Sequence, residues 1–365
     1  MKIAVDAREL HGKPTGVGRF LRKLLGEWRN IAAAQAHEFI TLAPGSRNKT
    51  GGTLWEQLVL PGLVRQAAAD VLFAPAYSGP LFSPAPMVVA VHDVSFAAHP
   101  EWFGWREGAR RRATARLSTR AAASVITVSE FSKREIVTHL GTDPSKITVV
   151  YEGVTTFVGM PAERAATSGR TVLFVGSIFN RRHIPELIEG FARLARTRPD
   201  LQLEIVGDNR TSPRVDVDAF VRATDVADRV HLRAYVSDEQ LYRLYTDASA
   251  FVFLSEYEGF GLTPLEALAS GIPVVLLDTP VAREICGDAA HYVAQPDPRL
   301  IENALAAVLF ETSERERILS AAKRILSRYS WTDCAARVLD VLVAAGRRGA
   351  DTSGIDAAAS APKAG

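Results

Sequence analysis

Short apolar segments rich in Val and Ile alternate with longer segments of helical character along almost the whole chain. In the first half these segments are KIAVDA, EFITLA, DVLFAPA, MVVAVHD, SVITVS and KITVVYEG, and in the second half they are TVLFVG, LQLEIVG, RVHLRAYV, SAFVFLS and IPVVLLD. Strands that alternate with helices form βαβ units around a parallel sheet. The pattern therefore predicts an α/β protein with two Rossmann-like parallel sheets.

One break in this pattern divides the chain. Residues 160–170, MPAERAATSGR, have no apolar period and collect Pro, Ala, Ser and Gly, which is typical of a linker. We therefore expect one domain at 1–165, a second at 166–330, and a terminal helix at 331–345 that crosses back to the first domain. The tail at 346–365 has too little apolar material to pack, and we expect it to be disordered.

Composition narrows the class of partner. The formal net charge is +2, so the whole molecule is not expected to attract nucleic acid. No apolar run approaches the roughly 20 residues that span a bilayer, and the first ten residues lack a signal core, so we expect a cytoplasmic protein. Cys286 and Cys334 lack a Cys or His at ligand spacing. We expect neither a metal nor a cofactor.

The most specific stretch runs from Ser255 to Pro273, SEYEGFGLTPLEALASGIP. It joins a buried strand, a glycine-rich turn and a helix predicted to begin near Thr263. Glycines let backbone amides approach a ligand closely, and a helix amino terminus suits a diphosphate. Glu258 lies before the helix and Glu266 one turn inside it. Glu266 has a second interpretation, because Thr263 to Glu266 reads as a capping box.

The stretch E-G-F-G-L-T-P-L-E, from Glu258 to Glu266, resembles the E-x7-E signature of family 4 glycosyltransferases. Further segments resemble that family in the same order along the chain: TGVGRF, VHDVSF, VITVSEFSKREI and VGSIFNRRHIPELIEGF. The resemblance covers nearly the whole chain as far as about Ala345. It implies the GT-B fold, in which two Rossmann-like domains face a cleft, with the acceptor on the side of the first domain.

The resemblance also assigns roles to residues. It implies catalytic roles for His92, Glu258 and Arg182, with Asp93 orienting His92. It implies a donor-binding set that includes a glycine loop near the amino terminus: Gly16, Gly18, Arg181, Gly259, Phe260, Gly261, Leu262, Thr263 and Glu266. The arginines would face the diphosphate, Glu258 the sugar hydroxyls and Glu266 the nucleoside.

Each of these features has a plainer interpretation. A lone histidine after a strand is often structural, and an arginine pair is often only solvated surface. Gly16 and Gly18 could open a dinucleotide fingerprint, but Leu21 stands where its third glycine belongs. Asp216 and Asp218 resemble a D-x-D metal site, although they open a predicted helix, where acidic side chains complement the dipole.

The resemblance implies transfer of a hexose with retention of the anomeric configuration and without a metal. The donor is a nucleotide sugar, with GDP-mannose favoured by likeness to bacterial O-antigen and exopolysaccharide enzymes. The acceptor is a glycan or a lipid-linked glycan. UDP- and TDP-sugars stay open as donors, as does a nucleotide-sugar-binding subunit without activity.

A basic and aromatic segment lies at residues 102–120. Trp102 and Trp105 precede a helix that carries six arginines: Arg106, Arg110, Arg111, Arg112, Arg116 and Arg120. An exposed, solvated helix is one interpretation. The other is a face that binds an anionic membrane, which would make the protein peripheral at the inner side of the cell membrane.

Overall fold

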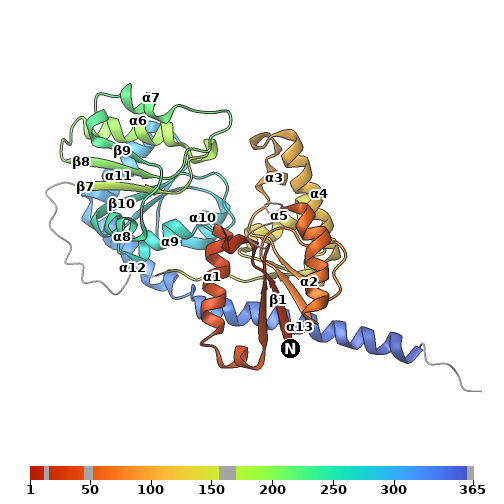
Figure 1. Ribbon diagram of the computed structural model, residues 1–365. Coiled ribbons are helices and arrows are strands. Elements are labelled where there is room, and N and C mark those ends of the chain that lie inside the picture. Colours follow the sequence, from red (N-terminus) through yellow and green to blue (C-terminus); the bar gives the residue numbers. More distant parts are fainter. Residues whose placement is uncertain (12–15, 45–51, 156–169, 360–365) are drawn as a thin grey trace, which may run out of the picture. The chain divides into compact units, whose positions relative to one another are not determined.

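The computed structural model describes residues 1–11, 16–44, 52–155 and 170–359 (Figure 1). The chain forms two compact units, one made of Met1–Gly153 with Ser330–Gly365 and the other of Val154–Tyr329. It therefore passes from one unit to the other after Gly153 and returns after Tyr329. Apart from Arg170, which begins a strand, the predicted linker lies outside the described residues.

The first unit is built on a sheet of six parallel strands in the order β2-β1-β3-β4-β5-β6. The strands are β1 (Lys2–Asp6), β2 (Glu38–Leu42), β3 (Val71–Ala74), β4 (Met87–Ala90), β5 (Ser124–Thr127) and β6 (Ile147–Val149). The helices are α1 (Gly16–Trp28), α2 (Leu60–Gln66), α3 (Ser95–Ala98), α4 (Trp105–Ala121), α5 (Glu130–Leu140) and α13 (Trp331–Ala359). Each predicted apolar segment of this half contains one strand.

Both faces of this sheet are buried. Ile3 and Val5 of β1 pack with Phe20 of α1 in one apolar cluster, whereas Ala4 between them joins Leu60 of α2 in a second cluster. Successive side chains of a strand point to opposite faces, so a strand covered on both sides must be apolar throughout. This is why the strands read as continuous apolar runs instead of alternating patterns.

The last helix, α13, belongs to the first unit. Its Val338 and Leu342 are buried in the same cluster as β1. The prediction of disorder over 346–365 is wrong as far as Ala359, where α13 ends, and residues 360–365 lie outside the described residues. The helix continues because it keeps a surface to pack on: Gly346 lies against the Met1 side chain, and Gly349 lies against the Pro86 ring too closely for a side chain.

The second unit is built on another sheet of six parallel strands, in the order β12-β11-β10-β7-β8-β9. The strands are β7 (Arg170–Val175), β8 (Leu201–Val206), β9 (Val230–Arg233), β10 (Ala248–Phe253), β11 (Val274–Leu277) and β12 (His291–Val293). The helices are α6 (Ile184–Ala195), α7 (Val217–Arg222), α8 (Asp238–Asp247), α9 (Leu262–Ala269), α10 (Pro280–Cys286), α11 (Pro298–Phe310) and α12 (Thr312–Leu326). Two parallel α/β sheets confirm the predicted fold class.

Sheet order shows where each unit should bind ligands. Ligands of open parallel sheets lie beyond the carboxyl ends of the strands, where the strand order reverses. In the second unit that reversal lies between β7 and β10, and in the first between β1 and β3. The loops that follow these four strands are therefore the first places to look for a site.

Candidate active site

Arg182 reaches the switch point of the second unit from the loop after β7. It lies in a short 3-10 helix, Asn180–Arg182, and its Nη1 donates to the carbonyl oxygen of Ser177 at 2.8 Å. Gly176 has φ +151°, and a Cβ there would come 2.7 Å from Arg182 Nη1. The glycine is needed because the guanidinium fills the space that a side chain would take.

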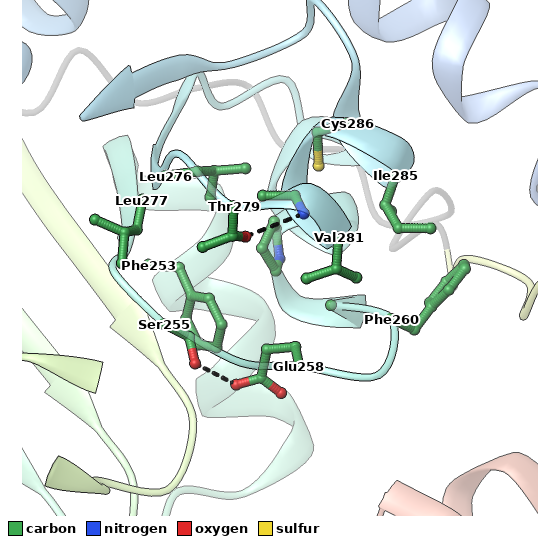
Figure 2. Close-up of a pocket in the computed structure, with 13 residues that line it drawn as sticks. Phe253, Ser255, Glu258, Phe260, Leu276, Leu277, Thr279, Val281, Ile285 and Cys286 are labelled. Atoms are coloured by element: carbon green, nitrogen blue, oxygen red, sulfur yellow. Dashed lines mark hydrogen bonds between the residues drawn. The ribbon is translucent and has the colours of Figure 1, made fainter. Parts of the chain in front are cut away.

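Glu258 reaches the same point from the loop after β10. Arg182 donates to Glu258 Oε1 from Nε at 2.9 Å and from Nη2 at 2.6 Å, and the Ser255 hydroxyl donates to the same oxygen at 2.7 Å. Figure 2 shows the bond from Ser255. The hydrogen bonds that described residues make to this carboxylate all end on Oε1. Oε2 therefore stays available to a hydroxyl group of a ligand.

Arg181 lies beside this pair but is held differently. Its Nε donates to the carbonyl oxygen of Tyr257 at 3.4 Å, and its guanidinium lies 4.2 Å from the centre of the Phe179 ring. The Arg182 guanidinium lies 5.4 Å from the same ring. The two arginines thus keep both positive charges at the carboxyl edge of β7, and the structure brings Arg181, Arg182 and Glu258 together.

Gly261 opens the helix that follows Glu258. It has φ +94° and is the N-cap of α9, and no side chain caps this end by a hydrogen bond. Leu262 and Thr263 form the first turn, so their backbone N–H groups are available to an anion. The ring of Phe260 is buried and meets Tyr329 edge-on at 5.4 Å.

Next to this turn lies a pocket with mainly apolar walls (Figure 2). Ser255 and Glu258 reach it from the loop after β10, and Thr279, which caps α10 through the Ala282 N–H, is a further polar member. Its apolar lining comes from β10, β11, α10 and the turn before α9: Phe253, Phe260, Leu276, Leu277, Val281 and Ile285. An apolar pocket with a few polar groups at one side is typical of small-molecule sites.

The capping-box interpretation of Glu266 is wrong. The helix begins two residues earlier than that motif requires, since Gly261 takes the N-cap position that Thr263 would have had. Glu266 is 3% exposed, and the Tyr245 hydroxyl donates to its Oε2 at 3.3 Å. The buried carboxylate of Glu266 therefore does not serve to cap the amino terminus of α9.

In the first unit, His92 follows β4 by two residues. Its Nδ1 lies 3.0 Å from Oε1 of Glu152, its Nε2 lies 3.1 Å from the carbonyl oxygen of Pro75, and its ring meets Phe20 edge-on at 4.8 Å. The predicted orienting role of Asp93 is wrong. Asp93 instead accepts hydrogen bonds from the backbone N–H and hydroxyl of Ser95 at the start of α3.

Gly16 and Gly18 do not form a loop. They lie in the first turn of α1, where Gly18 is buried, and the residues just before them, 12–15, lie outside the described residues. In the second unit, Asp216 is the N-cap of α7 and accepts a hydrogen bond from the Ala219 N–H at 3.0 Å, so its carboxylate serves the helix end as expected.

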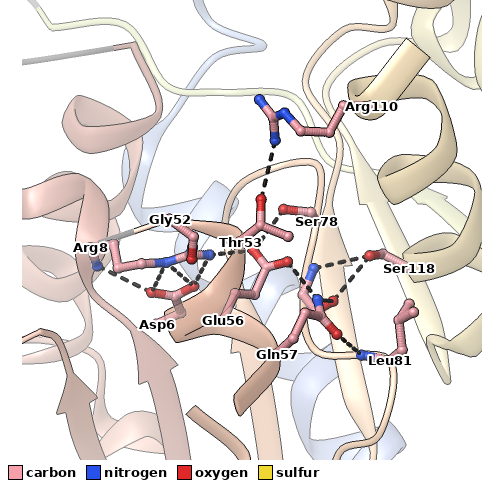
Figure 3. Close-up of polar contacts among 11 residues, drawn as sticks. Asp6, Arg8, Gly52, Thr53, Glu56, Gln57, Ser78, Leu81, Arg110 and Ser118 are labelled. Carbon is pink, nitrogen blue, oxygen red and sulfur yellow. Dashed lines mark hydrogen bonds and ion pairs between the residues drawn. The ribbon is translucent and has the colours of Figure 1, made fainter. Parts of the chain in front are cut away.

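The sequence reasoning missed a polar cluster at the switch point of the first unit (Figure 3). Arg8 donates to Asp6 at the end of β1 and to Glu56 at 2.6 Å, and Ser78, after β3, donates to Glu56 at 2.7 Å. Asp6 and Glu56 are each 2% exposed. Burial raises the pKa of Asp6, although Arg8 lowers it in part. A charged residue at the end of an apolar strand was the available signal for Asp6.

The arginines of α4 fall into two groups. Arg111 pairs with Glu107 and Arg112 donates to the carbonyl oxygen of Phe96, whereas Arg110 reaches Thr53 on a neighbouring segment (Figure 3). Trp105 is 76% exposed. Among the described helices, none is long and apolar enough to cross a membrane. Within the same residues, no group of His, Cys, Asp and Glu side chains could hold a metal ion.

Two family models match this chain one after the other. The model for Glycosyltransferase Family 4 matches residues 16–156, and the model for Glycosyl transferases group 1 matches residues 160–325. The first therefore falls in the unit that carries His92, and the second covers Arg182 and Glu258.

Curated relatives agree with these models. The chain is 28% identical to an MMP alpha-(1->4)-mannosyltransferase of Mycolicibacterium hassiacum over 66% of this chain and 57% of that protein. It is 29% identical to a glycogen synthase of Mycobacterium tuberculosis over 87% of this chain and 81% of that one. It is 26% identical to a GDP-mannose:cellobiosyl-diphosphopolyprenol alpha-mannosyltransferase of Xanthomonas oryzae pv. oryzae over 70% and 67%.

A solved structure gives the same fold. The HepE protein of Anabaena, crystallised with UDP and glucose, superposes with a TM-score of 0.74 at 20% identity, covering 94% of this chain and all of the other. The two family models, their order along the chain and two parallel sheets with charged switch-point loops agree with one another. The protein is a glycosyltransferase with the GT-B fold, in which a region like Glycosyltransferase Family 4 precedes a region like Glycosyl transferases group 1.

Proposed function

We propose that the protein transfers mannose from GDP-mannose to a glycan or lipid-linked glycan, with retention of the anomeric configuration and without a metal ion. The observation that carries this proposal is the Arg182–Glu258 pair beside the open amino terminus of α9. Relatives named for mannosyl transfer, one of them with GDP-mannose and a diphosphopolyprenol-linked acceptor, support the choice of donor and acceptor.

The chemistry follows from the charges in the second unit. As the bond between the sugar and the diphosphate breaks, negative charge grows on the leaving phosphate, where Arg181, Arg182 and the first N–H groups of α9 can stabilise it. The acceptor hydroxyl forms its bond to the anomeric carbon from the same face. Its proton passes to the leaving phosphate. Glu258 holds sugar hydroxyls through Oε2, and Glu266 holds the ribose.

The donor is tested by melting the protein with a panel of GDP-, UDP-, ADP- and TDP-sugars, because a bound ligand raises the melting temperature by mass action. GDP-mannose should give the largest rise. A larger rise with a UDP- or TDP-sugar would replace the donor while keeping the reaction. Binding without turnover of any donor would leave a nucleotide-sugar-binding subunit.

Metal independence and stereochemistry have separate tests. Turnover should persist in excess EDTA, and loss that magnesium or manganese restores would overturn the metal-free proposal. NMR of an early product should show the donor's anomeric configuration. An inverted coupling pattern would contradict retention even if transfer itself is confirmed.

We also propose that the protein works in the cytoplasm at the inner face of the cell membrane, through α4 and its neighbours. Trp105 is exposed, and Arg110 ties α4 to the segment in which Leu54 and Leu58 are 69% and 74% exposed. Exposed apolar side chains beside arginines suit an anionic membrane surface. Arg111 and Arg112 are half-buried, whereas Arg106, Arg110 and Arg120 are exposed, so these three are the better arginines to test.

Reversing these three charges to Glu should release the protein from anionic vesicles at low salt, since each basic residue near such a surface contributes about 1 kcal/mol. A matched triple reversal in the second unit, at the exposed Arg222, Arg243 and Arg324, makes the same change in net charge and should not release it. Nucleotide binding should be unchanged in both. Wild-type protein that ignores such vesicles would leave α4 a solvated helix.

A further inference from the structure

Both ring nitrogens of His92 face an oxygen that can only accept a hydrogen bond. Nδ1 is 3.0 Å from the Glu152 carboxylate, and Nε2 is 3.1 Å from the Pro75 carbonyl oxygen. A neutral imidazole carries one N–H group, whereas the imidazolium carries two. With the Glu152 carboxylate ionised, only the charged ring satisfies both contacts at once.

Glu152 is placed by packing that local sequence does not determine. It follows β6 by three residues and is 4% exposed, while the next residue, Gly153, lies against Trp331 at the start of α13 too closely for a side chain. The ring of Phe20, 6.3 Å from that of Trp331, also covers His92. The carboxylate is thus fixed where the chain leaves the first unit and where it returns.

We infer that Glu152 is a positioning residue for transfer: it fixes the orientation of the His92 ring and keeps the ring doubly protonated. The Nε2–H group is then held at the carboxyl edge of β4, where an oxygen of the donor can replace the Pro75 carbonyl as its acceptor. The catalytic consequence rests on the proposed function, but the state of the histidine does not.

The surrounding charges agree with this assignment. Burial lowers the pKa of His92, but its hydrogen bond with Glu152 and the charge of that carboxylate outweigh burial and raise the pKa above its usual value. Among the described residues, Asp93 also favours the charged ring, and the pKa of the Cys334 thiol on α13 is raised by burial and by Glu152, although Arg337 lowers it in part. The thiol therefore stays neutral. His92 therefore loses its proton at a higher pH than an ordinary imidazole does.

The test is Glu152→Gln, which keeps the shape of the side chain and removes its charge. Histidine-selective NMR titration of the full-length protein should show the His92 signal, assigned with a His92→Gln variant, moving its midpoint to lower pH. The basic limb of the kcat profile should move with it, so turnover falls more at pH 8 than at pH 6. Each unit of that movement corresponds to a tenfold loss on the basic side.

Two variants separate positioning from a structural effect. Glu101→Gln removes the partner of His99, which makes the same Nδ1 to Oε1 contact at 3.1 Å on the exposed surface, and should change neither the kcat profile nor the His92 titration. Glu152→Asp should restore part of the shifted limb because it keeps the charge, and it carries the test if Glu152→Gln does not fold.

In a His92→Gln background, Glu152→Gln should cost no further turnover. The inference is overturned if the His92 midpoint is unchanged, or if turnover falls by one factor at every pH and falls again in the His92→Gln background. If no donor is turned over by wild-type protein, the proposed function fails, while the NMR titration still decides whether Glu152 sets the charge of His92.

Discussion

The two units each hold an acid–base pair at the carboxyl edge of a six-stranded parallel sheet, and the pairs differ in what they leave open. Arg182 and Glu258 keep 11% and 20% of their side chains exposed, and the bonds to Glu258 converge on one oxygen. His92 and Glu152 keep 16% and 6%, and both ring nitrogens of His92 are occupied.

A ligand can therefore contact the Arg182–Glu258 pair directly, whereas Glu152 acts on a ligand only by setting the orientation and charge of His92. In the second unit a carboxylate oxygen and a helix end are available, so substitutions should act on turnover and binding directly. In the first unit the carboxylate is reached only through His92, so its loss should act through protonation. Substitutions graded by the size of their expected effect test this contrast.

The largest effect is expected from Glu258→Gln. The change removes the charge that faces sugar hydroxyls and also the partner of Arg182, so turnover should fall roughly 10²–10³-fold, by analogy with the loss of one stabilising contact in a transition state. Melting temperature and affinity for the bare nucleoside diphosphate should stay close to wild type. Glu256→Gln, on the neighbouring exposed carboxylate that contacts His183, is the control and should keep turnover.

Arg182→Lys should have the next largest effect. Lysine keeps the charge but cannot donate through both Nε and Nη2 to Glu258 while also reaching Ser177. Lysine keeps a charge near the leaving phosphate but loses the paired donors, so kcat/KM should fall by at least about 10-fold, less than in Glu258→Gln. Arg196→Lys, in an exposed pair with Asp225, should leave kcat/KM unchanged. An equal loss in both variants would mean that charge-pair geometry has no special role at the switch point.

Glu266→Ala should affect binding and stability together, at a smaller scale. It leaves the buried Tyr245 hydroxyl without this acceptor and removes the predicted partner of the ribose, so we expect a loss of about 1–3 kcal/mol in unfolding free energy and weaker nucleotide binding. Tyr245→Phe removes the same internal bond but keeps the carboxylate. If Glu266 contacts the nucleotide, calorimetric titration should show weaker affinity for Glu266→Ala only; equal affinities would refute that role.

The sequence was sufficient for the features that repeat or that depend on neighbouring residues. Apolar runs predicted the strands, and the segments around Arg182 and Glu258 were correctly placed in loops that follow strands. The helix start near Glu266 was misjudged because Gly261, with its left-handed backbone, takes the cap position ahead of Thr263. Local motifs do not show which of two overlapping starts the tertiary structure selects.

Contacts between distant segments could not be predicted in this way. Glu152 lies 60 residues from His92 and reaches it only because β4 and β6 belong to the same sheet, so the adjacent Asp93 was chosen instead. The helical course of α13 beyond Ala345 depends on Met1 and Pro86, which pack against its glycines. The low apolar content of this segment predicted disorder because composition does not show that distant residues pack against it.

The smallest effect concerns His183, which lies between the arginines and α6 with φ +52°. Burial lowers the pKa of His183, but hydrogen bonding to Glu186 and the charge of Glu256 raise it above its usual value. A histidine with a raised pKa in the folded state stabilises the protein below its unfolded pKa of about 6.5, and this contribution is lost as pH rises through the folded pKa.

Asn accepts the left-handed backbone, so His183→Asn should fold and keep its turnover. Since both carboxylates are well exposed, the lost stabilisation should be under about 1 kcal/mol. Denaturant unfolding at pH 5.5 and pH 8.5 should show the variant weaker than wild type at the lower pH and equal to it at the higher. A deficit that is the same at both values would assign the effect to backbone strain or packing, and a loss of turnover would place His183 with Arg182 in the site.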